Sequence, residues 1–306
     1  QELKDRIASV IVGQEQTVDL VLTAILANGH VLIEGVPGVA KTLLARLTAR
    51  LIDADFSRVQ FTPDLMPSDV LGTTVFNMKT NGFDFHQGPI FADIVLVDEI
   101  TRAPAKTQAA LFEVMEERQI SIDGTTHRMG DLYTILATQN PVEQEGTYKL
   151  PEAQLDRFLM KITMDYPSLE EEVNILERHH TNAALVKLDD ITPAITKEEL
   201  LSLRAFMNQV FVDRTLLQYI ALIVQQTRTS KAVYLGASPR ASVAMLQSSK
   251  AYALLQGRDF VTPEDIKFVA PYVLQHRLIL TAEAEMEGYS PVKVTQRLID
   301  KVEVPK

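Results

Sequence analysis

The segment 35–42 constrains this chain more than any other part of its sequence. It reads Gly-Val-Pro-Gly-Val-Ala-Lys-Thr, follows the apolar run 30–34, and continues into a helical pattern over 43–47. A strand, a glycine-rich loop ending in Lys-Thr, and a helix form a phosphate-binding loop, in which backbone amides and the helix N-terminus face an anion. The sequence therefore predicts a phosphate site, where Lys41 reaches the outer phosphates and the Thr42 hydroxyl coordinates magnesium.

One residue of the loop departs from the usual pattern. Ala40 stands where a glycine usually precedes the lysine. Alanine need not weaken phosphate binding if its φ is negative, because only a positive φ strains a residue with a side chain. The loop alone is a moderate signal, since glycines beside a strand are more often turn residues. The residues expected around the phosphates are Gly35, Val36, Pro37, Gly38, Val39, Ala40, Lys41 and Thr42.

The composition excludes several other kinds of site. The 306 residues are enough for two domains and a large core. The chain contains no cysteine, which removes disulfides, thiolate catalysis and cysteine-based zinc sites, and which fits a cytoplasmic protein. No apolar run approaches the roughly 20 residues needed to span a bilayer. The formal net charge of −10 argues against a nucleic-acid motor, which usually carries a basic face.

Two regions of the chain differ in their hydrophobic patterning. Residues 1–166 alternate apolar runs with helical patterns, which predicts an α/β domain with a largely parallel sheet. Residues 167–306 read as a smaller, all-helical domain, whose helix starts are marked by capping pairs such as Ser168 with Glu171. The strands expected in the first region are His30–Glu34, Arg58–Phe61, Ile94–Val97, Tyr133–Thr138 and Met160–Met164.

Two stretches of the first region have the pattern of inserted hairpins. Asn81-Gly82 lies between apolar residues within 72–85, and Asp123-Gly124 lies at the centre of the alternating stretch 119–128. Asn-Gly and Asp-Gly favour tight hairpin turns, because both positions of such a turn take a positive φ. Each stretch is therefore predicted to form two antiparallel strands.

The apolar run 94–97 ends in two acids, Asp98 and Glu99. A buried parallel strand reads as a continuous apolar run, and ligands bind beyond the carboxyl ends of such strands. Asp98 can there hold the magnesium ion that Thr42 also touches, and Glu99 can polarise a water for attack on the γ-phosphate. The alternative is a strand that ends in a solvated acidic turn. The phosphate loop upstream makes that alternative the minor one.

Three further polar residues are candidates whose local pattern is weaker. Asn140 follows the strand expected over 133–138 and can hold the attacking water, although Asn-Pro is also a common turn. Arg157 can neutralise charge in a neighbouring subunit's site, or can form a surface pair with Asp156. Arg240 opens a helix of the second region and can reach a γ-phosphate, or can simply be exposed.

The order of these motifs resembles that of an AAA+ ATPase, and within that superfamily the chain is similar to the MoxR-type ATPases. Alanine before the lysine is common among MoxR proteins, whereas Thr101 stands where the family usually has asparagine. The matching stretches are Gly35–Thr42, Phe61–Leu71, Gln87–Phe91, Asp98–Gln108, Ala137–Pro141, Leu150–Phe158 and Gly236–Ala241.

The resemblance implies a P-loop core followed by a helical lid, and it assigns further roles by position. Val12, Gly13 and Gln14 would line the adenine pocket. Asn140 matches sensor 1, and Arg240 matches sensor 2. Arg157 stands where related ATPases have an arginine finger, and Arg102 is a second candidate for a role across the subunit interface. The stretch 62–85 resembles the helix-2 insert and 119–128 the pre-sensor-1 hairpin, both of which face the pore or the client in ring ATPases.

The resemblance further implies ATP and Mg²⁺ as ligands, a ring oligomer, expected to be a hexamer, and chaperone-like remodelling or maturation of protein clients. A client or partner with a von Willebrand factor A domain is one expectation, and binding of nucleic acid is not expected. Two alternatives stay open at this point. One is a nucleic-acid or chelatase-type motor, and the other is a nucleotide-gated switch, although no guanine-specifying Asn-Lys-x-Asp motif is present.

Overall fold

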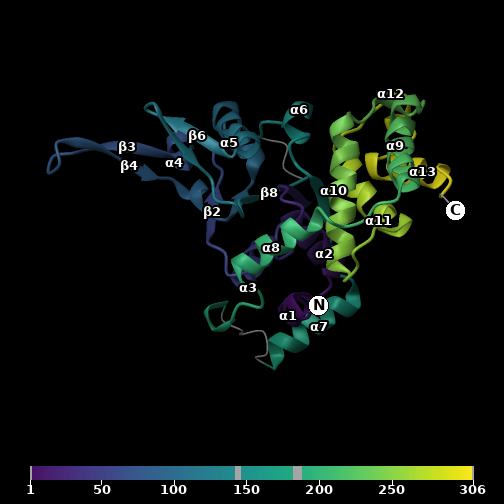
Figure 1. Cartoon of the computed structure of the whole chain (residues 1–306), viewed down its shortest axis with the longest axis horizontal. Helices are drawn as coiled ribbons and strands as arrows, with labels where there is room; N and C mark the ends of the chain where they lie inside the picture. Colours follow the sequence, from purple (N-terminus) through teal and green to yellow (C-terminus); the bar gives the residue numbers. More distant parts are fainter. Residues whose placement is uncertain (1, 142–145, 182–187, 305–306) are drawn as a thin grey trace. The chain divides into compact units, whose positions relative to one another are not determined.

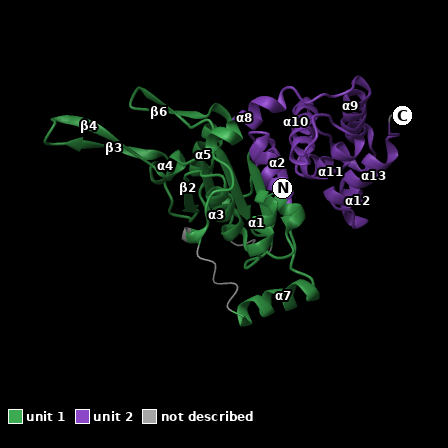
Figure 2. Cartoon of the chain, turned by 60° about the horizontal axis from the view of Figure 1, so that its bottom comes forward, with its two compact units in different colours: residues 1–18, 30–150, 163–201 green, residues 19–29, 151–162, 202–306 purple. Residues whose placement is uncertain are grey.

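The computed structural model describes residues 2–141, 146–181 and 188–304 (Figure 1). The chain forms two compact units (Figure 2). Unit 1 comprises Gln1–Val18, His30–Leu150 and Thr163–Leu201, and unit 2 comprises Asp19–Gly29, Pro151–Ile162 and Ser202–Lys306.

A five-stranded sheet carries the first region, in the order β2-β5-β8-β1-β9. The strands are β1 (Val31–Gly35), β2 (Phe56–Gln60), β5 (Ile94–Asp98), β8 (Thr134–Gln139) and β9 (Met160–Met164). The pairs β2–β5, β5–β8 and β1–β8 are parallel, and the apolar residues of the three central strands are buried, as a parallel sheet covered on both faces requires. The expected parallel sheet is confirmed, with strand ends shifted by a residue or two.

Helices of unit 1 flank this sheet. They include α1 (Glu2–Val10), α3 (Lys41–Leu51) and α5 (Ala105–Glu117). Helix α3 buries Leu44, Leu47 and Leu51, which lie on one face at helical spacing, and it packs against β2 and β5. The short helices α4 (Pro67–Leu71), η1 (Pro89–Phe91) and η2 (Ile100–Arg102) connect strands, and η3 (Leu188–Asp190) and α8 (Lys197–Met207) follow later in the chain.

Both predicted hairpins are present. Strands β3 (Gly72–Asn77) and β4 (Gly82–Gln87) pair antiparallel, as do β6 (Gln119–Ile122) and β7 (Thr125–Arg128). Asp123 and Gly124 take φ values of 49° and 79°, as the predicted two-residue turn requires. In the first hairpin Asn77 pairs with Gly82, so the loop consists of residues 78–81 and only Asn81 has a positive φ, of 50°. The tight turn expected at Asn81-Gly82 is therefore wrong, because Gly82 already belongs to β4. The hairpins extend away from the central sheet (Figure 2).

Unit 2 is mainly helical over its described residues. Its helices α9 (Arg214–Thr229), α10 (Pro239–Leu255), α11 (Pro263–Leu274) and α13 (Pro291–Lys301) pack on one another. The unit also contains two short helices, α6 (Glu152–Leu155) and α12 (Ala282–Met286). A short antiparallel ladder joins β10 (Val233–Leu235) to β11 (Ile279–Leu280), which the helical pattern did not indicate, since two or three residues give no detectable period.

The units interleave along the chain. Helix α2 (Glu15–Leu26) begins in one unit and continues in the other. Helix α7 (Leu169–His180) belongs to unit 1, where Arg178 Nη1 donates to Ser9 O at 2.8 Å and Ser168 and Glu171 form the expected capping box. The domain boundary after residue 166 stays a prediction, and the compact units divide the chain differently because α7 and residues 188–201 bond back to the first region.

Candidate active site

The phosphate loop connects the end of β1 to the start of α3. Gly38 has φ +90° in the middle of the loop, and Ala40 is the N-cap of α3 with φ 60° and ψ 22°. Ala40 therefore does not have the negative φ that would leave it unstrained. It adopts the left-handed conformation that glycine usually provides. The physical reason is that a left-handed residue turns the loop so that successive amides face one concavity, and this chain tolerates the strain of a Cβ there.

Lys41 and Thr42 are the first two residues of α3, and both are partly buried. The Lys41 ammonium donates to Gly35 O at 2.6 Å, so the side chain folds back across the loop. Thr42 lies at the N-terminal end of the helix, where the amides of the first turn have no acceptor within the helix. Both residues therefore lie where a bound phosphate would meet a cation, a hydroxyl and free amides.

Asp98 is the last residue of β5 and is buried. Its Oδ1 accepts a hydrogen bond from Thr138 Oγ1 at 3.1 Å, and its Oδ2 accepts one from Arg58 Nε at 2.6 Å. Arg58 on β2 and Thr138 on β8 were not predicted as site residues. The strand pattern offered a signal only for Thr138, which lies near the carboxyl end of β8, whereas Arg58 is the central residue of β2.

Glu99 follows immediately and has φ 56°, which turns its side chain away from the strand direction. Its backbone N–H donates to Thr138 Oγ1 at 3.0 Å, and its carboxylate accepts from Arg102 Nε at 2.8 Å. Thr138 thus ties both acids to β8. Arg102, a candidate for a role across a subunit interface, pairs with Glu99 of its own chain.

Asn140 is the residue after β8, and it is partly buried. Strand β8 lies between β5, which carries the acids, and β1, which leads into the phosphate loop. Its last residue, Gln139, donates through its amide to Glu34 of β1. The sheet therefore brings the predicted Asn140, Asp98, Glu99 and phosphate loop to one edge, as the carboxyl ends of parallel strands require.

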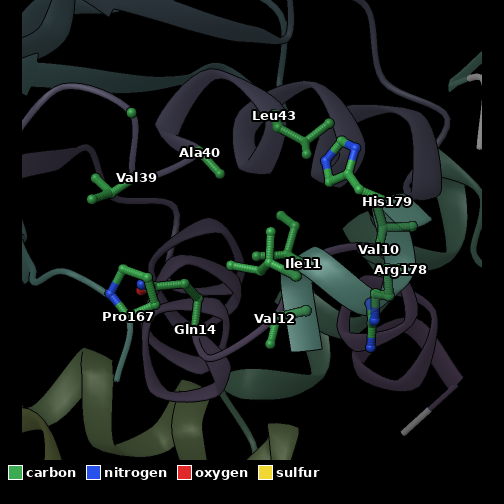
Figure 3. A pocket seen from close by; sticks show the side chains of 12 residues that line it. Val10, Ile11, Val12, Gln14, Val39, Ala40, Leu43, Pro167, Arg178 and His179 are labelled. Atoms are coloured by element: carbon green, nitrogen blue, oxygen red, sulfur yellow. The ribbon is translucent and has the colours of Figure 1, made fainter. Parts of the chain in front are cut away.

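A cavity of about 280 Å³ opens beside the phosphate loop. Figure 3 shows Ile11 and Val12 on one side of it and Ala40 and Leu43 on the other. Gly13 is not itself among the lining residues, whereas Val12 and Gln14 are, as predicted. The lining residues that were not predicted come from α1, α3 and α7 and from two positions outside the helices, Ile11 and Pro167. The lining consists of Val10, Ile11, Val12, Gln14, Gly38, Val39, Ala40, Leu43, Pro167, Ile175, Arg178 and His179.

The walls of this cavity suit a flat, weakly polar ring beside an anionic tail. Valine and isoleucine side chains form one wall, and the phosphate loop forms the other. Gly13 has φ +71°, and a Cβ at this residue would lie 2.4 Å from Glu171 Cδ at the start of α7. Glycine is favoured here because the backbone has a positive φ, and a Cβ would also displace the flexible end of the Glu171 side chain.

Arg157 and Arg240 lie in unit 2. Arg157 follows α6 and is partly buried, and Arg240 is the exposed second residue of α10. Asp156, the residue before Arg157, accepts a hydrogen bond at Oδ1 from Arg277 Nε at 2.6 Å. Burial lowers the pKa of Arg277. Its hydrogen bond with Asp156 raises this pKa, whereas the positive charge of Arg240 lowers it further.

The oxygen donors at this edge fit magnesium only together with a nucleotide. Among the described residues, no group of three or more histidine, aspartate or glutamate side chains could hold a metal ion. Magnesium is usually bound by one or two protein oxygens with substrate phosphates and water, which matches a Thr42 hydroxyl and an Asp98 carboxylate beside a phosphate loop.

None of the helices in the described part of the chain is long and apolar enough to cross a membrane.

Comparison with known proteins agrees with this geometry. The model of the ATPase family associated with various cellular activities (AAA) matches residues 30–160, and that of the AAA lid domain matches residues 225–300. Chaperone MoxR1 of Mycobacterium tuberculosis is 44% identical over 306 residues, covering 97% of this chain and 80% of that protein. The chain belongs to the MoxR family of AAA+ ATPases.

Two further relatives cover nearly the whole chain. YeaC of Bacillus subtilis, an uncharacterized protein, is 47% identical over 98% of this chain and 93% of its own length. The solved structure of a candidate ATPase from Cytophaga hutchinsonii is 41% identical, has a TM-score of 0.91, and matches 100% of this chain and 94% of that one. The predicted P-loop core, helical lid and ATPase activity of this MoxR-family protein are thus confirmed.

Proposed function

We propose that this MoxR-family ATPase hydrolyses ATP with Mg²⁺ and uses the energy, as a ring oligomer, to remodel or mature partner proteins. The observation that carries the proposal is the common edge of the sheet, where the phosphate loop, Asp98, Glu99 and Asn140 follow β1, β5 and β8. MoxR1 of Mycobacterium tuberculosis is named a chaperone, which supports the coupling to protein clients.

Each side chain at this edge has a part in the proposed hydrolysis. The Lys41 ammonium moves from Gly35 O to the outer phosphates, and Asn140 holds the attacking water. Glu99 orients that water as a general base, and this requires its carboxylate to leave Arg102. Magnesium, held by Thr42 and Asp98, would neutralise charge that develops on the phosphates. The base of ATP occupies the cavity beside Val12 and Gln14.

The two arginines of unit 2 are proposed to complete the site. Arg157 acts as a finger on the nucleotide of a neighbouring subunit in a hexameric ring, and Arg240 acts as sensor 2. An arginine finger contributes roughly 10³- to 10⁵-fold to turnover in related phosphoryl transfers. Arg157→Ala should therefore lose turnover while fluorescent-ATP binding is retained. Full activity of this variant would remove the assignment.

The two hairpins are proposed to contact the client, for which a protein with a von Willebrand factor A domain is one candidate. Phe76 and Phe83 are exposed and pack edge to face with ring centroids 5.2 Å apart. A cavity of about 520 Å³ lies between the hairpins, lined by Thr74, Phe83, Phe85, Ile122, Asp123, Thr125 and His127. Large exposed apolar surfaces of this kind favour protein partners over nucleic acid.

The test is capture of clients from a cytoplasmic extract, the compartment in which we expect the protein to act. Glu99→Gln should bind ATP without hydrolysing it and so retain clients, whereas Lys41→Ala, which lacks the phosphate contact, is the matched control. Proteins enriched by the first variant only with ATP would support remodelling. Recovery of nucleic acid alone would contradict remodelling and favour a nucleic-acid motor.

A further inference from the structure

The turn that carries Arg157 lies between α6 and β9 and belongs to neither element. It comprises residues 156–159, in which Phe158 is fully buried and Arg157 is partly buried. Residues outside helices and strands lack a regular ladder of hydrogen bonds, so the backbone carbonyls of such a turn need other partners. The source of those partners determines how firmly the backbone of Arg157 is held.

Three consecutive residues that follow α11 supply partners to this turn and to the start of β9. Gln275 Nε2 donates to Lys161 O, and His276 Nε2 donates to Phe158 O at 3.0 Å. Gln275 and His276 are buried, and the side chain of Arg277 is 4% exposed. All of these residues belong to unit 2, so the contact lies within one compact unit.

Arg277 makes the largest part of this contact. Its Nε donates to Asp156 Oδ1 at 2.6 Å, and its Nη2 donates to Asp156 O at 3.1 Å and to Phe158 O at 2.7 Å. Its Nη1 donates to Leu159 O at 3.1 Å and to a carbonyl of α11. These five bonds match the five N–H groups of a guanidinium. Arg277 therefore bonds to carbonyls on both sides of Arg157 and fixes the backbone that bears it.

The charge of Arg277 is costly for a residue that only fills the interior. Burial lowers its pKa, and the positive charge of Arg240 lowers this pKa further. A buried ion pair is weak evidence for stability, since apolar residues of similar volume often replace one without loss. An apolar side chain at this position could not donate to the carbonyls of the turn. The feature that requires an arginine here is thus the conformation of residues 156–159.

We propose that Arg277 is a positioning residue for Arg157, and that it holds the turn so that the Arg157 guanidinium reaches the nucleotide of a neighbouring subunit. The role of Arg277 rests on the proposed role of Arg157 as a finger. A lysine at this position keeps the charge but has three donors on a flexible stem and no planar fork, so it would loosen the turn. A misplacement of about 1 Å can lower turnover roughly 100-fold.

The first experiment compares Arg277→Lys with Arg258→Lys. Arg258 donates to the buried Asp265 near the start of α11, at 2.5 and 2.8 Å, so its replacement disrupts a comparable ion pair away from the turn. Both variants should lower Tm in calorimetry. Only Arg277→Lys should lower kcat for ATP, by about 10- to 100-fold, and its KM should not change because Arg277 does not line the nucleotide cavity.

A folded Arg277→Lys variant with the kcat of the parent overturns the proposal. If this variant does not fold, Asp156→Ala takes its place, because it removes one of the five bonds and leaves the carbonyl contacts. Its kcat should fall about tenfold, and an unchanged kcat overturns the proposal.

A double variant and a mixed ring separate positioning from a general structural role. Arg157→Ala with Arg277→Lys should hydrolyse ATP no more slowly than Arg157→Ala alone, because both changes remove the same contact. Arg277→Lys mixed with Glu99→Gln, which lacks the base but keeps the finger, should hydrolyse ATP faster than the two separate preparations together. A further loss in the double variant, or a mixture without recovery, overturns the proposal.

Arg157→Ala measured alone distinguishes the two levels of the argument. Full activity of this variant removes the finger, and with it both the proposed function of Arg157 and the role of Arg277. Loss of activity in Arg157→Ala together with normal activity in Arg277→Lys leaves the finger intact and overturns only the role of Arg277.

Discussion

The carboxyl edge of the sheet and the pair of hairpins are both built by strands of unit 1, but their side chains are held differently. At the sheet edge the two acids already have partners, Arg58 for Asp98 and Arg102 for Glu99. At the hairpins the large side chains of Phe76 and Phe83 are exposed and contact each other. Prearranged polar groups suit one fixed ligand, whereas exposed apolar surface is stabilised only when a partner covers it.

The largest effect on ATP turnover is expected from a substitution in the phosphate loop, whereas a matched substitution in a hairpin should have almost none. Lys41→Ala should lower ATP hydrolysis at least about 100-fold, because it removes a cation that faces the developing phosphate charge. Lys79→Ala, which removes a lysine from the turn of the β3–β4 hairpin, is the matched control and should stay within about twofold of the parent. If the measured rate of phosphate release falls equally in both variants, the claim that only the phosphate loop takes part in hydrolysis is wrong.

The converse variant tests the hairpins. Phe76→Ala with Phe83→Ala should leave basal hydrolysis unchanged and remove any stimulation by a permanently unfolded, carboxymethylated protein, because the apolar contact is lost. Tyr234→Ala, at an exposed aromatic residue of unit 2, is the control for loss of surface aromatic area. A double variant that is stimulated as strongly as the parent would show that the hairpins do not bind this probe.

A smaller effect is expected where the cavity depends on a close approach. Gly13→Ala should raise the KM for ATP about tenfold, a cost of roughly 1.4 kcal/mol, because its Cβ would displace the Glu171 carboxylate that caps α7 beside the nucleotide cavity. Gly257 has a similar φ of +75° but open space around it, so Gly257→Ala should cost stability without changing KM. Equal KM values for the two variants would contradict the steric explanation.

The smallest effect concerns the phosphate loop itself. Ala40→Gly should stabilise the protein by about 0.5–1 kcal/mol, because relief of the left-handed strain exceeds the added entropy of the unfolded chain. A rise in Tm of about 1–2 °C by calorimetry would follow. Ala45→Gly, in the buried interior of α3, should lower Tm. A Tm that falls for both variants would mean that the Ala40 conformation is not strained.

Much of the site could be predicted because its residues are adjacent in sequence or follow apolar strands. Gly35–Thr42 and Asp98-Glu99 each carry their own local pattern, and the turn at Asp123-Gly124 follows from positive φ values. The partners of these residues could not be predicted. Arg58 and Thr138 reach Asp98 from strands that are 40 positions away in sequence in each direction, and only sheet order makes them neighbours.

The sequence by itself determined the family, the phosphate loop, the acids at the end of a strand and the two hairpins, because each depends on local residue patterns. The tertiary structure decided the rest. It set the left-handed φ of Ala40, paired Glu99 with Arg102, and used α7 to form a wall of the nucleotide cavity while Leu169 and Leu176 of the same helix stayed exposed. These features depend on which distant segments pack together, and hydrophobic periodicity identifies the apolar face of a helix without identifying what covers it.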